Sequence, residues 1–168
     1  MIKRSLSLIL LMSFFCITAC SSTSDHSSVS AEELASRIED SVPLSDGYYR
    51  ASEAYFGYYF SEITADEWVI CRSSSQASEN EFGIILASEN ASTVQAACED
   101  YLEAQLNSYM ASKASYSPAE YEKYRDASVK VIGNYVIYTI MTTSDQKKSL
   151  FNCRKLIEIK KVTAHFVR

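Results

Sequence analysis

The chain has 168 residues, with 16 basic and 21 acidic side chains and a formal net charge of −5. This length predicts one folded domain. The acidic balance excludes a nucleic-acid partner, because nucleic acid binds to basic surfaces. The same balance argues against adsorption of the chain on anionic lipid through its net charge.

The first twenty residues have the pattern of an export signal. Lys3 and Arg4 precede an apolar stretch of 13 residues, positions 5–17, and the tetrapeptide Ile17-Thr18-Ala19-Cys20 closes the pattern. A helix of that length covers roughly 20 Å, less than the roughly 30 Å hydrocarbon core of a bilayer. The pattern therefore predicts a signal peptide rather than a membrane-spanning helix.

The closing tetrapeptide resembles the lipobox of bacterial lipoproteins. The resemblance implies lipid transfer to the Cys20 thiol and cleavage between Ala19 and Cys20, with two acyl chains giving a stable anchor. We expect a signal peptide at 1–19, a Ser-rich tether at 20–30 and a single domain at 31–168. The expected location is the extracytoplasmic face of a cell membrane. An ordinary secretory signal and an N-terminal membrane helix are the alternatives.

Three cysteines remain beyond Cys20, at positions 71, 98 and 153. We expect them to be buried as small apolar side chains, with one disulfide as the alternative outside the cell. No CxxC spacing occurs, and His26 and His165 lie near opposite ends of the mature chain. No metal site or other cofactor is predicted.

Turn and capping signals divide the domain into alternating helices and hairpins. Helices are expected from Ser30 to Val42, from Ser92 to about Lys113, from Ser117, and from Ser144 to about Ile157. Strands 67–72 and 81–87 form one predicted hairpin, and residues 129–138 form another around a type II′ turn at Gly133-Asn134. The tail, 158–168, has no clear pattern. The expected fold is an α+β two-layer sandwich: an antiparallel sheet built from two β-hairpins, with helices packed on one face.

Residues 48–60, YYRASEAYFGYYF, are the most unusual segment, since seven of the thirteen are aromatic. They are interpreted as a helix broken at Gly57. Exposed tyrosines can stack on sugar rings or on a protein, so this segment is a candidate partner-binding surface. Core packing is the alternative role. The candidate side chains are Tyr48, Tyr49, Tyr55, Tyr58 and Tyr59.

The sequence shows no catalytic constellation. A nucleophile usually needs a histidine base, and both histidines of the mature chain lie near its ends. The carboxylates near the second strand and on the long helix are interpreted as solvated surface charge; these are Glu79, Glu81, Glu89, Glu99, Asp100 and Glu103. A facing pair of them would permit glycosidase-type chemistry.

The chain resembles a family of small bacterial lipoproteins, the domain of unknown function 4358 (DUF4358). The segments that resemble it are Glu67 to Ala87, the long acidic helix, Tyr116 to Tyr121 and Val131 to Val136, and the resemblance covers about residues 31–157. The family has no assigned activity, so the resemblance implies the fold and no functional residues.

Together these features predict a non-enzymatic binding or accessory module of the cell envelope, anchored by lipid on Cys20. Its expected partner is an envelope protein or a cell-wall glycan. A carboxylate-based envelope hydrolase and a passive structural component are the alternatives.

Overall fold

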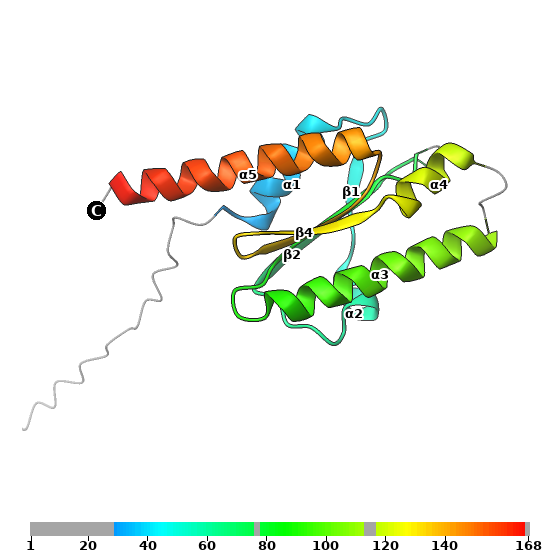
Figure 1. Cartoon of the computed structure of the whole chain (residues 1–168), viewed down its shortest axis with the longest axis horizontal. Coiled ribbons are helices and arrows are strands. Elements are labelled where there is room, and N and C mark those ends of the chain that lie inside the picture. Colours follow the sequence, from blue (N-terminus) through cyan, green and yellow to red (C-terminus); the bar gives the residue numbers. More distant parts are fainter. Residues whose placement is uncertain (1–28, 76–77, 113–116, 167–168) are drawn as a thin grey trace, which may run out of the picture.

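The computed structural model describes residues 29–75, 78–112 and 117–166. The predicted signal peptide, the lipidation pair Ala19 and Cys20, and the tether up to residue 28 lie outside the described residues. Within the described ranges, five strands form one antiparallel sheet in the order β1-β2-β3-β5-β4 (Figure 1). Their bounds are β1 Tyr48–Arg50, β2 Glu67–Ser73, β3 Glu81–Leu86, β4 Ser128–Ile132 and β5 Tyr135–Ile140.

Helices cover both faces of this sheet. One face carries α1 (Ala31–Ser41) and α5 (Thr143–Phe166), while the other carries α2 (Glu53–Tyr59), α3 (Ala91–Ser112) and α4 (Pro118–Arg125). Two separate clusters of buried residues fill these spaces. Val69, Ile84 and Ile137 point toward α1 and α5, whereas their strand neighbours Ile70 and Ile85 point toward α3. The central strands are thus buried on both sides.

The expected α+β class and the antiparallel sheet are confirmed, but the placement of all helices on one face is wrong. Positions 82–86 of β3 and all six residues of β5 are buried or nearly so. A strand that reads as a continuous apolar run is covered on both faces. The sheet also has an edge strand outside the two hairpins, since β1 pairs with β2.

Most predicted elements form, with corrections at their ends. Ser30 caps α1 as expected, its hydroxyl accepting the Glu33 amide at 3.0 Å. By contrast, α3 begins at Ala91 rather than after Ser92, because the carbonyl of Asn90 accepts its first amides. Similarly, the hydroxyl of Thr142, and not that of Ser144, accepts the amide of Asp145 at the start of α5.

The aromatic segment and the tail also differ from expectation. Residues 48–50 form a strand, and Gly57 lies inside α2 instead of breaking a helix. The tail continues α5 as a helix as far as Phe166. The predicted type II′ turn is confirmed, because Gly133 has a φ of +62° while no residue other than glycine has a positive φ in the described chain.

Candidate functional site

A buried carboxylate lies at the start of β3. Glu81 is 4% exposed and faces the α3 side of the sheet. One of its oxygens, Oε1, accepts hydrogen bonds from the hydroxyls of Tyr101 at 2.5 Å and Tyr138 at 2.8 Å. The other oxygen, Oε2, accepts from Nε of Arg72 at 2.9 Å. The interpretation of Glu81 as solvated surface charge is therefore wrong.

Arg72 is held against Glu81 by the register of the sheet. It pairs with Glu81 across β2 and β3, and with Tyr49 across β2 and β1. Its guanidinium carbon lies 5.0 Å from the ring centroid of Tyr55 and 6.0 Å from that of Tyr49. Aromatic faces attract a guanidinium at such distances. The cation therefore has a carboxylate on one strand and aromatic rings from β1 and α2 around it.

Tyrosine hydroxyls extend the network. Tyr101 donates to Glu81, so its oxygen can accept from Tyr55, whose hydroxyl lies 2.6 Å away. The chain Tyr55–Tyr101–Glu81–Arg72 links α2, α3, β3 and β2. Each buried polar group in it has a partner, which is the condition under which such a network rigidifies a core.

Burial dominates the electrostatics of the network. Loss of solvent raises the pKa of Glu81, while the hydrogen bond from Tyr101 and the charge of Arg72 oppose that rise. Burial, followed by the charge of Glu81, raises the pKa of Tyr55 to about 12 and the pKa of Tyr101 further. The tyrosines therefore remain neutral donors at physiological pH.

A polar pocket of about 410 Å³ opens beside this network. Its volume falls within the range of ligand pockets in proteins. It lies between the ends of β2 and β3 and the C-terminal half of α3, with Tyr124 of α4 on its rim. The lining consists mainly of hydroxyl and amide groups: Ser73, Ser74, Ser75, Ser78, Ser108, Ser112, Tyr49, Tyr109, Tyr124, Asn80 and Gln105, together with Arg72, Glu79 and Glu81.

Helix α4 fixes the outer wall of the pocket. The hydroxyl of Tyr124 donates to Glu79 at 2.7 Å, and its ring stacks on Tyr109 of α3 with centroids 4.5 Å apart. Glu120 accepts the backbone amide of Glu79 at 2.8 Å and pairs with Lys123 at 2.7 Å. Burial, with the bond to Glu79, raises the pKa of Tyr124, which keeps its hydroxyl a donor.

The five tyrosines proposed as a binding surface do not form one surface: Tyr48 lies on the opposite face of the sheet, and the other four form a line of contacts that runs from Arg72 to the α2–α3 side. Tyr48 packs edge-on against Phe82 on the α1 side of the sheet, and its hydroxyl donates to the carbonyl of Val42. Tyr49 lines the polar pocket, and Tyr55 is half-buried beneath Arg72. Only Tyr58 and Tyr59 share one surface, a hollow of about 300 Å³ between α2 and α3.

Sequence reasoning gave no site role to Arg72, Tyr101, Tyr124 and Tyr138, and it interpreted Glu81 as surface charge. A signal for two of them was present, because the predicted hairpin places Arg72 directly opposite Glu81. Opposite charges at such a cross-strand position attract each other. The tyrosines gave no comparable signal. Tyr101 and Tyr124 lie on helices and Tyr138 on β5, and a tyrosine fits the half-buried face of either element whether or not its hydroxyl finds a partner.

The three cysteines of the domain are free and buried, as expected, and the alternative of a disulfide is not seen among them. Burial raises the pKa of Cys98 and of Cys153 to about 12, and that of Cys71 further. No group of three or more potential metal ligands occurs among the described residues. In the same part of the chain, no helix is long and apolar enough to cross a membrane.

Fold and site together define a three-layer α+β domain with a polar pocket over one face of its sheet. A family model described as Domain of unknown function (DUF4358) matches residues 58–141. The chain belongs to this family. The match includes Arg72, Glu81 and the whole of α3, and it leaves α1, β1 and α5 outside. No curated protein and no solved structure matches the chain.

Proposed function

We propose that the chain is a lipid-anchored, extracytoplasmic binding module of the cell envelope whose polar pocket receives a hydroxyl-rich ligand such as a cell-wall glycan. The signal pattern that ends at Cys20 supports the location. The pocket beside Arg72 and Glu81 supports the binding role. The proposed function is non-enzymatic because the buried carboxylate of Glu81 accepts hydrogen bonds from three donors of the chain rather than facing a substrate.

The chemistry of the lining is the observation on which the proposal rests. Serine hydroxyls and the amides of Asn80 and Gln105 both donate and accept hydrogen bonds, which matches the mixed requirements of sugar hydroxyls and N-acetyl groups. The rings of Tyr49, Tyr109 and Tyr124 provide flat apolar area at the rim. Arg72 also lines the pocket, and its hydrogen bond to Glu81 holds this cation in place.

The binding role is tested by titrating the full-length protein in detergent with a trimer of β-1,4-linked N-acetylglucosamine and measuring the heat of binding. Gln105→Ala and Ser108→Ala remove polar groups from the pocket and are expected to weaken binding about tenfold or more. Glu103→Ala, an exposed change on α3 outside the pocket, is the matched control. Equal affinity of all four proteins, or no saturable binding, would contradict the proposal.

A second candidate, a carboxylate-based hydrolase, is favoured by one observation: Glu79 and Glu81 line the same pocket. Glycoside hydrolysis uses two carboxyl groups, one of them with a raised pKa. Incubation of wild type, Glu79→Gln and Glu81→Gln with polymeric peptidoglycan separates the candidates. If the wild type releases reducing ends and both variants fail to do so, the hydrolase replaces the binding proposal. If none of the three proteins releases reducing ends, the binding proposal is retained over the hydrolase. A passive structural component would show neither release nor affinity.

The anchor is tested by fractionating cells that express Cys20→Ala. Without its lipid acceptor the variant is expected to remain unprocessed or to leave the membrane fraction. Cys16→Ala, in the apolar part of the signal, is the matched control and should mature normally. A Cys20→Ala protein that still matures and still fractionates with membrane would disprove the anchor.

A further inference from the structure

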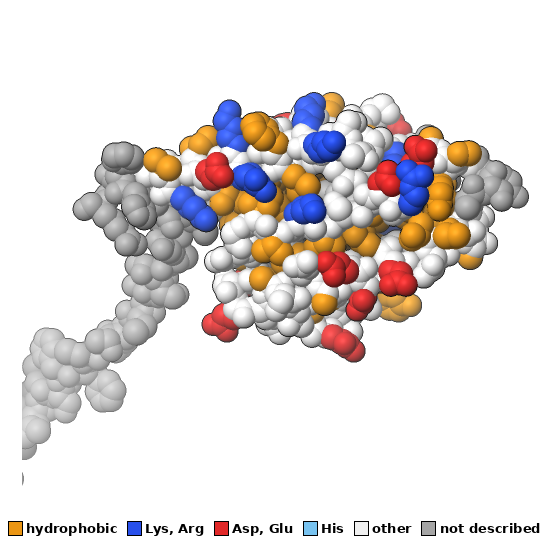
Figure 2. All heavy atoms as spheres, viewed as in Figure 1, with side chains coloured by type: hydrophobic (Ala, Val, Ile, Leu, Met, Phe, Trp, Pro, Cys, Tyr) orange, Lys and Arg blue, Asp and Glu red, His pale blue; other side chains and the backbone are white. Residues whose placement is uncertain are grey.

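The outer face of α5 differs in charge from the rest of the domain. The helix contains six basic and two acidic residues, a net charge of +4, although the whole chain has a net charge of −5. In Figure 2 the basic side chains gather over this helix, and the acidic ones predominate over α3 and α2 below it. The net charge of the chain therefore conceals a strong separation of charge between the two sides of the sheet.

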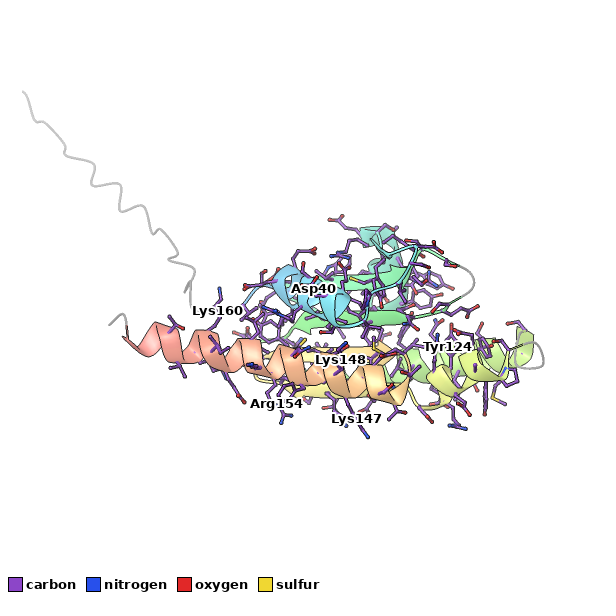
Figure 3. The ribbon with its side chains drawn as sticks, turned by 90° about the horizontal axis from the view of Figure 1, so that it is seen from above. Asp40, Tyr124, Lys147, Lys148, Arg154 and Lys160 are labelled. Atoms are coloured by element: carbon purple, nitrogen blue, oxygen red, sulfur yellow. The ribbon has the colours of Figure 1, made fainter. Side chains whose placement is uncertain are left out.

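Four cations of this face point to solvent and make no ion pair with any described residue: Lys147, Lys148, Arg154 and Lys155. Figure 3 shows Lys147 and Arg154 pointing away from the domain along one side of α5. At 3.6 residues per turn, Lys148 and Lys155, which are also seven residues apart, lie together along the other edge of the face. The face has one exposed carboxylate in the same stretch, Glu158.

Large apolar side chains occupy the space between these cations. Phe151 is 66% exposed, Ile159 52% and Val162 57%. The helical repeat places Phe151 and Val162 along the centre line of the exposed side, three turns apart. Exposed apolar groups flanked by lysine and arginine are the pattern of helices that lie in a membrane interface.

The position of the face relative to the predicted anchor fits the same role. Lys160 of α5 pairs with Glu33 of α1 at 3.5 Å, so the beginning of the domain lies beside the C-terminal half of α5. Eight residues separate Cys20 from Val29, the first described residue. Such a segment spans at most about 30 Å, which keeps α5 within reach of the membrane that holds the lipid.

We propose that the outer face of α5 docks on the anionic surface of the anchoring membrane, with Phe151, Ile159 and Val162 entering the interface and the four cations contacting lipid phosphates. This inference assumes the lipid anchor of the proposed function. In the docked orientation the α3 side of the sheet, where the polar pocket lies, faces away from the bilayer. The domain would then present its pocket outward while held flat by its last helix.

The test uses the full-length lipidated protein reconstituted into vesicles of phosphatidylcholine with 30% phosphatidylglycerol, or of phosphatidylcholine alone. An environment-sensitive dye is attached at Phe151→Cys, replacing one aromatic group by another. A dye at Glu103→Cys on α3 is the matched control. The three native thiols of the domain are buried, so we expect them to react slowly with the dye. Collisional quenchers on the lipid chains report insertion of the dye.

Docking predicts strong quenching of the dye at position 151 in the anionic vesicles, little quenching without phosphatidylglycerol, and none at position 103. Raising the salt from 0.1 M to 1 M should release the face, because it shortens the Debye length from about 10 Å to 3 Å. Lys155→Glu should lower the ratio of docked to free domain about 25-fold, roughly fivefold per unit charge. Arg125→Glu on α4 changes the charge equally and should leave the ratio unchanged.

Two results would overturn docking. If the protein floats with the vesicles but the dye at position 151 is not quenched, the anchor holds and the docking proposal fails. If that dye is shielded equally on neutral vesicles, and the shielding rises with protein density, a second copy of the chain covers the face instead. Failure of the protein to float at all would disprove the anchor itself, on which docking depends.

Discussion

The ring of Tyr138 lies directly over Gly83 of the neighbouring strand, so closely that a Cβ at position 83 would overlap it. Because Gly83 has no side chain, the ring of Tyr138 can extend across the sheet surface, and its hydroxyl can donate to Glu81. The small residue on β3 thus creates the space through which β5 reaches the buried carboxylate. Glycine is required here for close approach rather than for an unusual backbone angle.

Gly83→Ala is therefore expected to destabilise the protein by about 2–4 kcal/mol, since it displaces a fully buried ring and breaks its hydrogen bond. Gly57→Ala is the matched control. It lies inside α2 with nothing within 4 Å of the added methyl, and should stabilise by up to about 1 kcal/mol. Urea unfolding measures both changes. A neutral Gly83→Ala would mean that Tyr138 does not occupy this position.

The raised pKa of Glu81 predicts a pH dependence of stability. Because burial raises that pKa above 4.5 in the folded state, the folded protein retains a proton that the unfolded chain has lost. The free energy of unfolding then decreases as pH rises from about 4.5 through the folded pKa, and levels off above it. Glu81→Gln should remove this component of the slope, whereas the exposed Glu103→Gln should not. Thermal unfolding over a pH series measures it, and identical slopes for all three proteins would contradict the prediction.

Thr139 has the one buried side-chain polar atom without a hydrogen-bond partner among the described residues. Its hydroxyl points into the cluster beneath α1 and α5, opposite Phe82. Thr139→Val should stabilise the domain by about 1 kcal/mol, because it removes an unsatisfied group without changing the shape. Thr142→Val, which removes the cap of α5, should instead cost about 1 kcal/mol. Destabilisation by Thr139→Val in chemical unfolding would show that the hydroxyl has a partner.

The cysteines are expected to be unreactive until the domain unfolds. Their burial and raised pKa leave almost no thiolate at pH 8. A chromogenic disulfide reagent should therefore label Cys71, Cys98 and Cys153 only slowly in the native protein and rapidly in denaturant. Mass spectrometry of the digested protein identifies the labelled thiols. A thiol labelled at once under native conditions would show local opening around it.

Replacing Tyr58 and replacing Tyr59 should lower the stability of the domain to different extents. Tyr58 is 77% exposed, so Tyr58→Ser should change the melting temperature by less than about 2 °C. The ring of Tyr59 contacts those of Tyr55 and Tyr101, with centroids 4.7 and 5.1 Å away, so Tyr59→Ser should cost about 1 kcal/mol. If the α2–α3 hollow binds a partner, Tyr58→Ser alone should abolish its capture from solubilised envelopes. A large loss of stability in Tyr58→Ser would instead make this ring part of the core.

The sequence by itself determined the elements whose signals are local. The Ser30 capping box, the Gly133-Asn134 turn and the apolar stripe of α3 each depend on neighbours within one or two turns of chain. The residues that identified the family behave in the same way, because they describe turns and strands. The signal pattern that ends at Cys20 is likewise read from consecutive residues and remains a prediction.

Only the tertiary structure decided which face each element covers and what the polar side chains do. Glu81 looked like one surface carboxylate among several until Tyr101, twenty residues away, and Tyr138, fifty-seven residues away, were brought to it. The basic face of α5 was similarly hidden within a chain whose summed charge is acidic. Burial is a property of surfaces assembled from distant segments, so no local pattern specifies it. The six cations of α5 do lie in one segment of the sequence, and the fold decided only which of them face solvent.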